Sequence, residues 1–246
     1  MKPAENYLLA SIISDWSVCK WLTTLIICLW SWQLPAASPG LSAGLDLVSR
    51  YQWRGLVLSG SPAVQPFLEL QTGGFVMGAW GSASLQADDW QETDLYVGYR
   101  LGSFSLMVFD YFMYREQDQE DFFNYHPDRS AHVLELIASY EGSDKLPLRL
   151  LAGWNFYGAD PDRSLYGEAA WMGQSGNLDW ELFAGYTPSR GYYHEDRKGF
   201  THAGASLGRE WSLQGSSGIT LSMQSSVSYS FLLRKMLMHA SVGIAI

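Results

Sequence analysis

Apolar and polar residues alternate along most of the chain after Leu41, in segments of about ten residues. Because successive side chains of a β-strand point to opposite faces, this pattern predicts strands with one apolar and one polar face. The clearest segments are 44–54, 64–71, 92–101, 133–141, 148–156 and 179–186. Weaker strand-like segments cover 73–86, 103–114, 164–173, 199–211, 217–226 and 236–246.

The connections between these segments alternate between short and long. Short turns rich in Gly, Ser, Asn and Asp fall at 72–74, 102–103, 142–145, 173–177 and 214–217, and longer connections at 55–63, 86–91, 115–130, 157–163, 187–198 and 227–235. This asymmetry is typical of barrels in outer membranes. We therefore expect an all-β fold, a closed antiparallel transmembrane β-barrel of about 12 strands with up-and-down topology.

The two faces of these strands lead to expectations about individual residues. The lipid-facing leucines should be Leu47, Leu68, Leu95, Leu136, Leu150 and Leu182. A substitution of Leu136 by arginine should then destabilise the barrel, whereas Glu135→Gln should leave folding largely intact because Glu135 faces the lumen.

The start of the chain differs from the rest. Lys20 precedes the apolar run 21–32, and the small residues Ala36, Ala37 and Ser38 follow. This order is typical of a secretory signal peptide and is too short for a membrane-spanning helix. We expect residues 1–40 to be a signal peptide with an N-terminal extension and residues 41–246 to be the barrel; an amphipathic or core helix is the alternative.

Composition agrees with this reading. Eleven Trp and fourteen Tyr suit the aromatic girdles of a membrane barrel, although a soluble β-sandwich with an aromatic core remains an alternative. The net charge of -9 without a basic stripe argues against nucleic acid as a partner. Both cysteines, Cys19 and Cys28, precede Leu41, and we expect no metal or other cofactor. We interpret the acidic residues Asp88, Asp89 and Glu92, and those of 116–121, as solvated loop tips.

Two stretches carry a resemblance to a known family. The segments Ser49–Gly55 and Ser61–Pro66, with the element Tyr51-Gln52-Trp53-Arg54-Gly55, resemble the TorF-type family of outer-membrane porins. Weaker matches in the same order are Gly78–Ser82, Asp94–Tyr96, Asp110–Phe112, His132–Glu135, Tyr157–Asp160 and Gly191–Tyr193. The resemblance implies a signal-bearing barrel of the cell outer membrane of diderm bacteria, a channel, and no catalytic residues. Unlike many such barrels, the chain ends in isoleucine rather than an aromatic residue.

Charged residues on the inward face are the candidate functional residues. The pore-lining candidates are Asp46, Arg50, Arg54, Glu69, Asp94, Arg100, Glu135, Glu168 and Glu181. Opposed charges across a narrow lumen orient or select solutes. We therefore expect a porin for passive passage of small solutes, with the solute unknown and with outer-membrane lipid and the barrel-assembly machinery as partners.

Arg50 and Arg54 share one face with Asp46 in the first segment. Because an unpaired guanidinium in a confined lumen is costly, each arginine should have a carboxylate or carbonyl partner across the barrel. Glu69 is the first candidate partner for these arginines, and Asp94 and Glu181 are the next candidates.

Two other function classes are alternatives to a porin. The first is a non-conducting structural or interaction barrel, in which the aromatic residues of loop 115–130 form a contact surface or fold over the barrel mouth. The second is a membrane-embedded hydrolase, suggested by His126, Asp128, Ser130 and His132. His132 falls on the outward apolar face, and we find no nucleophile elbow, so we expect that the protein is not an enzyme.

Overall fold

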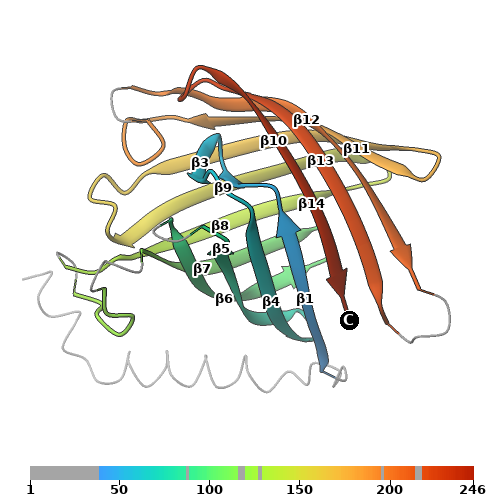
Figure 1. The fold of residues 1–246 in the computed structure, drawn as a ribbon, viewed down its shortest axis with the longest axis horizontal. Coiled ribbons are helices and arrows are strands. Elements are labelled where there is room, and N and C mark those ends of the chain that lie inside the picture. The colour runs from blue at the N-terminus through green and yellow to red at the C-terminus, as the bar shows by residue number, and fades with distance from the viewer. Residues whose placement is uncertain (1–38, 87–88, 116–119, 127–128, 195–196, 214–217) are drawn as a thin grey trace, which may run out of the picture. The chain divides into compact units, whose positions relative to one another are not determined.

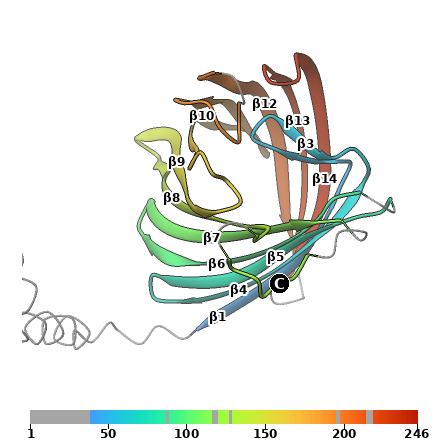
Figure 2. The same ribbon diagram turned by 90° about the vertical axis from the view of Figure 1, so that its left-hand side faces the viewer.

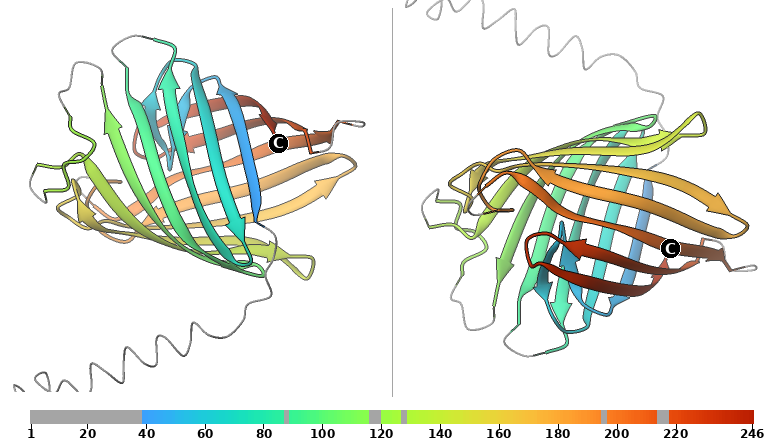
Figure 3. Two further views of the ribbon diagram at one scale, coloured as in Figure 1. Left: turned by 90° about the horizontal axis from the view of Figure 1, so that it is seen from below. Right: turned by 90° about the horizontal axis from the view of Figure 1, so that it is seen from above.

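The computed structural model describes residues 39–246 except 87–88, 116–119, 127–128, 195–196 and 214–217. Residues 1–38, which make up nearly all of the expected signal peptide, lie outside the described residues. Twelve described strands form a barrel (Figures 1 and 3): β1 (Gly40–Val48), β4 (Ala63–Thr72), β5 (Phe75–Ser84), β6 (Gln91–Leu101), β7 (Phe104–Tyr114), β8 (His132–Ser143), β9 (Leu146–Gly158), β10 (Leu165–Ser175), β11 (Leu178–Thr187), β12 (Gly199–Ser212), β13 (Thr220–Ser230) and β14 (Lys235–Ala245).

The barrel closes through its first and last strands. β1 pairs antiparallel with β14 on one side and with β4 on the other, and all other barrel neighbours are consecutive in sequence. Leu45, for example, lies opposite Ile244 on β14 and Pro66 on β4. The ladder between β1 and β14 joins Gly44–Val48 to Ser241–Ala245 and closes the sheet, while Lys235–His239 of β14 extends beyond the end of β1. The expected closed, antiparallel, twelve-strand barrel is confirmed.

The two faces of the barrel wall differ as the alternation predicted. Leu47, Leu68, Leu95, Leu150 and Leu182 are 42–56% exposed on the outer face. Leu136 is half-buried and alternates with the buried, inward-facing residues Glu135 and Ile137. Aromatic side chains pair on the outer face, Tyr186 with Phe200 and Tyr229 with Phe231 near the long connections, and Phe104 with Tyr140 near a short turn. Among the described residues, no helix is long and apolar enough to cross a membrane.

The first expected strand, 44–54, is interrupted. β1 ends at Val48, the chain bends at Ser49 and Arg50, and β2 (Tyr51–Trp53) then pairs with β3 (Leu56–Ser59). The two turn residues, Arg54 and Gly55, have φ of 51° and 88°. Two positive φ angles are typical of a type I′ turn, whose twist matches the twist of a two-stranded hairpin.

The hairpin β2–β3 lies within the ring of barrel strands (Figure 2). Its tip lies against β13, two strands from β1 in the barrel, where the Ser230 hydroxyl donates a 2.7 Å hydrogen bond to the Gly55 carbonyl oxygen. The expectation of one strand over 44–54 and a loop over 55–63 was therefore wrong. Alternation cannot distinguish a strand that continues in the wall from one that bends into the lumen, because both alternate with a period of two.

Two further expectations about the connections were wrong. The last outer connection is the short turn 231–234, because β13 and β14 continue their ladder to the pair Ser230–Lys235. In loop 115–130, the Phe122 ring packs against Phe112 and His132, with ring centroids 5.1 and 5.3 Å away. These two side chains lie on the outer side of the wall, so this ring covers the outer wall rather than the barrel mouth.

Candidate functional site

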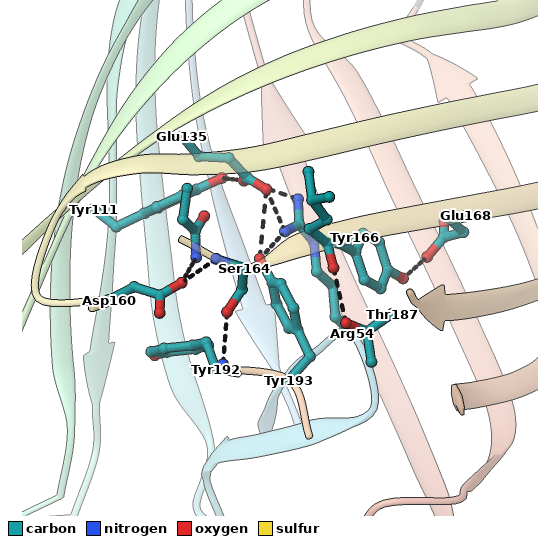
Figure 4. A network of polar contacts seen from close by, with 12 residues as sticks. Arg54, Tyr111, Glu135, Asp160, Ser164, Tyr166, Glu168, Thr187, Tyr192 and Tyr193 are labelled. Carbon is teal, nitrogen blue, oxygen red and sulfur yellow. Dashed lines mark hydrogen bonds and ion pairs between the residues drawn. The ribbon is translucent and has the colours of Figure 1, made fainter. Parts of the chain in front are cut away.

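The tip of the hairpin carries a buried ion pair. Arg54 donates two hydrogen bonds to Glu135 on β8, from Nη1 to Oε1 at 2.6 Å and from Nη2 to Oε2 at 2.9 Å (Figure 4). The side chains of Arg54 and Glu135 are 7% and 0% exposed. Such a bidentate pair fixes both the position and the orientation of the guanidinium. The hairpin is therefore fastened to the wall at a point 81 residues further along the chain.

Tyrosines complete the surroundings of this pair. The Tyr111 hydroxyl donates to Glu135 Oε2 at 2.7 Å, and the Tyr193 hydroxyl contacts both Arg54 and Glu135. The rings of Tyr166 and Trp53 lie 4.2 and 4.4 Å from Arg54 Cζ, which are cation–π distances. Burial alone would lower the pKa of Arg54, but Tyr193 and Glu135 outweigh it and raise that pKa. Arg54 therefore stays charged.

The backbone at the tip explains the sequence Arg-Gly. A positive φ is rare for a residue with a side chain and costs of order 1 kcal/mol, so Arg54 adopts it at an energetic cost. A Cβ atom on Gly55 would lie 2.8 Å from the Thr201 carbonyl oxygen on β12. Glycine therefore lets the tip approach β12 closely, while the adjacent Arg54 reaches Glu135 on β8.

Two chambers lie on either side of this hairpin. The larger, about 840 Å³, lies toward the short turns and is lined by Glu69, Arg100 and Gly102 among others. The smaller, about 430 Å³, lies toward the long connections. Trp53 and Tyr111 line both chambers, and their ring centroids are 5.6 Å apart. These two rings, with the Arg54–Glu135 pair beside them, form the layer between the chambers, which we call the constriction.

Four of the nine predicted inward charges are paired with one another, Arg54 with Glu135 and Arg100 with Glu69. Arg100 donates to both carboxylate oxygens of Glu69, at 2.7 and 3.0 Å. Glu69 is therefore the partner of Arg100 and not of Arg54, and the expected order of partners for Arg54 was wrong. The reason is geometric, since the hairpin carries Arg54 away from β1 and toward β8. Glu168 on β10 and Glu181 on β11 both form ion pairs with Arg149 on β9.

The remaining candidates are placed as follows. Asp94 lines the larger chamber, and Asp46 is half-buried beside Gly243 of β14. Arg50 has a buried Nε without a hydrogen-bond partner, and no carboxylate lies within ion-pair distance of it in the described part of the chain. The partner expected for Arg50 is thus not found there. The role of all nine residues as pore-lining groups stays a prediction.

Sequence reasoning missed three contributors to the site. Arg149 and Tyr193 were not among the candidates, although Arg149 falls on the inward face of its segment. Glu92 was interpreted as a solvated loop tip, but it lies in β6, is 5% exposed and has Tyr51 of the hairpin as a neighbour. The hairpin buries Glu92, and the alternation of polar and apolar residues along the chain does not predict this burial.

Of the residues that suggested a hydrolase, Asp128 lies outside the described residues, and His132 and Ser130 are arranged differently from a catalytic site. His132 is fully buried, with Nδ1 2.6 Å from Asp110 Oδ1 and Nε2 2.7 Å from the Phe122 carbonyl oxygen. Both ring nitrogens face acceptors, so neither is free to take a proton from a nucleophile. Ser130 Oγ accepts a hydrogen bond from the His132 backbone amide at 3.0 Å. Within the described residues, no group of three or more His, Cys, Asp or Glu side chains is arranged to hold a metal ion.

Comparison with known proteins gives two similarities. Residues 33–142 match the model of a family described as "Bacterial protein of unknown function (Gcw_chp)". The fold is similar to the crystal structure of the COG4313 outer membrane channel from Pseudomonas putida F1, with 12% identity over 86% of this chain and 96% of that chain and a TM-score of 0.42. A similarity at this level carries no argument about function. No curated protein matches, and the TorF-type name is not confirmed.

Proposed function

We propose that this chain is a β-barrel of the cell outer membrane that passes small solutes passively, with the hairpin β2–β3 as its constriction. The observation that carries the proposal is a pair of chambers, about 840 and 430 Å³, inside one closed barrel and sharing the Trp53–Tyr111 layer. A lumen filled by wall side chains alone would need no such hairpin.

The outer wall supports the membrane location. Its leucines, such as Leu47 and Leu182, are about half exposed, which in water would form an unusually large apolar surface. A lipid bilayer removes that cost, and the closed ladder satisfies the backbone within the hydrocarbon. Outer-membrane lipid and the barrel-assembly machinery are accordingly the partners we propose.

The constriction would set the size and charge of what passes. Each chamber meets the Trp53 and Tyr111 rings, and the adjacent Arg54–Glu135 pair is fixed by two hydrogen bonds. Because the pair is neutral overall, ions crossing this layer would respond to less compensated charges near it, such as Asp94 of the larger chamber.

Single-channel recording in planar bilayers tests the proposal. The wild-type barrel should conduct, and replacing residues 50–59 by a Gly-Ser linker should raise its conductance because the constriction is removed. A matched control replaces the turn 231–234, which lies outside the lumen, by Gly and Ser and should leave conductance unchanged. Equal conductance with and without the hairpin would contradict the role of the hairpin as the constriction.

A non-conducting structural or interaction barrel is the second candidate. The buried, bidentate Arg54–Glu135 pair favours it, because such a pair can seal the lumen permanently. The same recordings separate the two functions: a silent wild-type barrel with a conducting hairpin-replaced variant would indicate a sealed barrel. Catalysis is not part of the proposal, and a lipid-hydrolysis assay on the purified protein tests that exclusion.

A further inference from the structure

The smaller chamber contains two buried acceptor atoms without partners. Oε2 of Glu92 and Oδ1 of Asn155 make no hydrogen bond, and their residues are 5% and 1% exposed. Both residues line this chamber. A buried polar atom without a partner is energetically costly, and most proteins avoid it. Two such atoms on residues that line one cavity point to a ligand that supplies hydrogen-bond donors to both.

The orientation of both side chains is fixed by their other contacts. Asn155 Nδ2 donates to Asp160 Oδ2 at 2.8 Å, and because a carboxylate only accepts, this contact fixes which amide atom is the oxygen. Glu92 is 5% exposed and lies beside Tyr51 and Asp94, which restricts its side chain. Both side chains are therefore largely held in place before any ligand arrives, which lowers the entropic cost of binding.

The charge of the chamber favours a cation. Glu92 lies beside Asp94, so this part of the lining is acidic. Glu120 adds a further carboxylate to the lining. The nearby cation Arg54 is already neutralised by Glu135, and Arg115 lies over the Trp90 ring without lining the chamber.

Aromatic rings form much of the remaining wall. Trp53, Trp90, Tyr111 and Tyr192 line the chamber, and aromatic faces attract ammonium groups through their π-electrons. The volume of about 430 Å³ suits a small molecule. A primary ammonium has three N–H donors and can satisfy both free oxygens, whereas a quaternary ammonium has none.

We propose that this chamber binds small primary amines, with Glu92 and Asn155 accepting hydrogen bonds from the ammonium and the aromatic rings enclosing the rest. As a statement about the transported solute, this inference rests on the proposed channel. As a statement about binding, it is tested without conductance.

The test uses isothermal titration calorimetry on the purified full-length protein in detergent. The probes are benzylamine, its quaternary analogue benzyltrimethylammonium, and the neutral benzyl alcohol. Benzylamine should bind saturably, and at least about tenfold more tightly than either analogue, because each analogue lacks the N–H donors or the charge.

Glu92→Gln should weaken benzylamine binding at least about tenfold, since it removes the charge and keeps the side-chain volume. The matched control is Glu141→Gln, which alters a carboxylate of the larger chamber and should leave binding unchanged. Circular dichroism verifies that both variants fold. If Glu92→Gln does not fold, the relative affinities of the three probes for the wild-type protein still test the proposal.

Three results would overturn the inference: no saturable benzylamine binding to the wild type, equal binding of the quaternary analogue, or undiminished binding to a folded Glu92→Gln variant. The outcomes are separable from those of the channel proposal. Amine binding by a barrel that does not conduct would contradict only the channel proposal. Conductance without amine binding would contradict only the proposed amine site.

Discussion

Arg54 and Glu135 are joined by two hydrogen bonds of 2.6 and 2.9 Å, although one belongs to a hairpin inside the lumen and the other to the barrel wall. This pair couples the position of the hairpin to the integrity of the wall. Both side chains are buried, so neither can lose its partner without leaving a charge or a polar group in a water-poor environment.

Removing the carboxylate charge should therefore destabilise the barrel. Glu135→Gln leaves the Arg54 guanidinium buried without its counter-charge, and we expect a loss of about 3–5 kcal/mol in the free energy of unfolding. This revises the expectation from the sequence that Glu135→Gln would spare folding, because that expectation assumed a solvated side chain. Urea unfolding in detergent measures the loss, with Glu141→Gln as the control. A loss no larger than that of the control would contradict the structural role of the pair.

A second prediction concerns the outer wall. Leu136→Arg and Leu182→Arg should each destabilise the barrel by about 2–4 kcal/mol if the residue lies near the bilayer midplane, because an arginine must then enter the hydrocarbon. Leu136→Phe keeps the surface apolar and serves as the control. Refolding into lipid vesicles with a urea titration measures the difference. Similar stability of Leu136→Arg and Leu136→Phe would show that this face does not contact lipid.

A third prediction tests the close approach of the hairpin tip. Gly55→Ala places a Cβ atom 2.8 Å from the Thr201 carbonyl oxygen at a φ of +88°, so it should displace the tip and lower stability by more than about 1 kcal/mol. Gly73→Ala is the matched control, because Gly73 also has a positive φ but nothing lies within 4 Å of its Cβ position. Chemical denaturation compares the two variants. Equal losses would mean that the contact with β12 contributes nothing.

The fourth prediction concerns ion selectivity. If the barrel conducts, Arg50→Ala and Arg54→Ala should each shift selectivity toward cations, since each removes a fixed positive charge and Arg54→Ala also exposes the Glu135 carboxylate. Reversal potentials in a salt gradient measure the shift. Arg209→Ala serves as the control, because Arg209 lies on the same outer face of β12 as the exposed Leu207 and over the Trp211 ring. Unchanged selectivity in a conducting double variant would show that ions do not pass these arginines.

The fifth prediction is a loss of stability at alkaline pH. Burial raises the pKa of Tyr192 to about 12, and the nearby carboxylates of Glu92 and Asp160 make smaller contributions in the same direction. In the unfolded chain this pKa is about 10, so the contribution to stability is complete below pH 10 and is lost as the pH rises to about 12. Tyr192→Phe has no group to ionise and should lose less stability over this range in thermal unfolding. Identical losses in the two proteins would contradict the assignment.

Several properties of this protein follow from its sequence alone. The alternation of residues such as Leu45, Asp46 and Leu47 assigns each side chain to a face, because the period of a strand is fixed at two by its backbone geometry. Since that rule is local, the sequence predicted the closed barrel, the strand number and the outward leucines. The short turns could also be predicted from the sequence, because glycine at positions such as Gly73 and Gly102 supplies the positive φ that these turns require.

The constriction was decided by the tertiary structure. The element Tyr51–Gly55 could be recognised as unusual, yet whether it continues the wall or bends inward depends on contacts with Thr201, Ser230 and Glu135, far along the chain. Likewise Arg54 and Glu69 are closer in sequence than Arg54 and Glu135, but the closed ring brings β8 to the hairpin tip. Partners of this kind are set by the closure of the whole barrel, because only the complete ring places opposite walls within reach of one side chain.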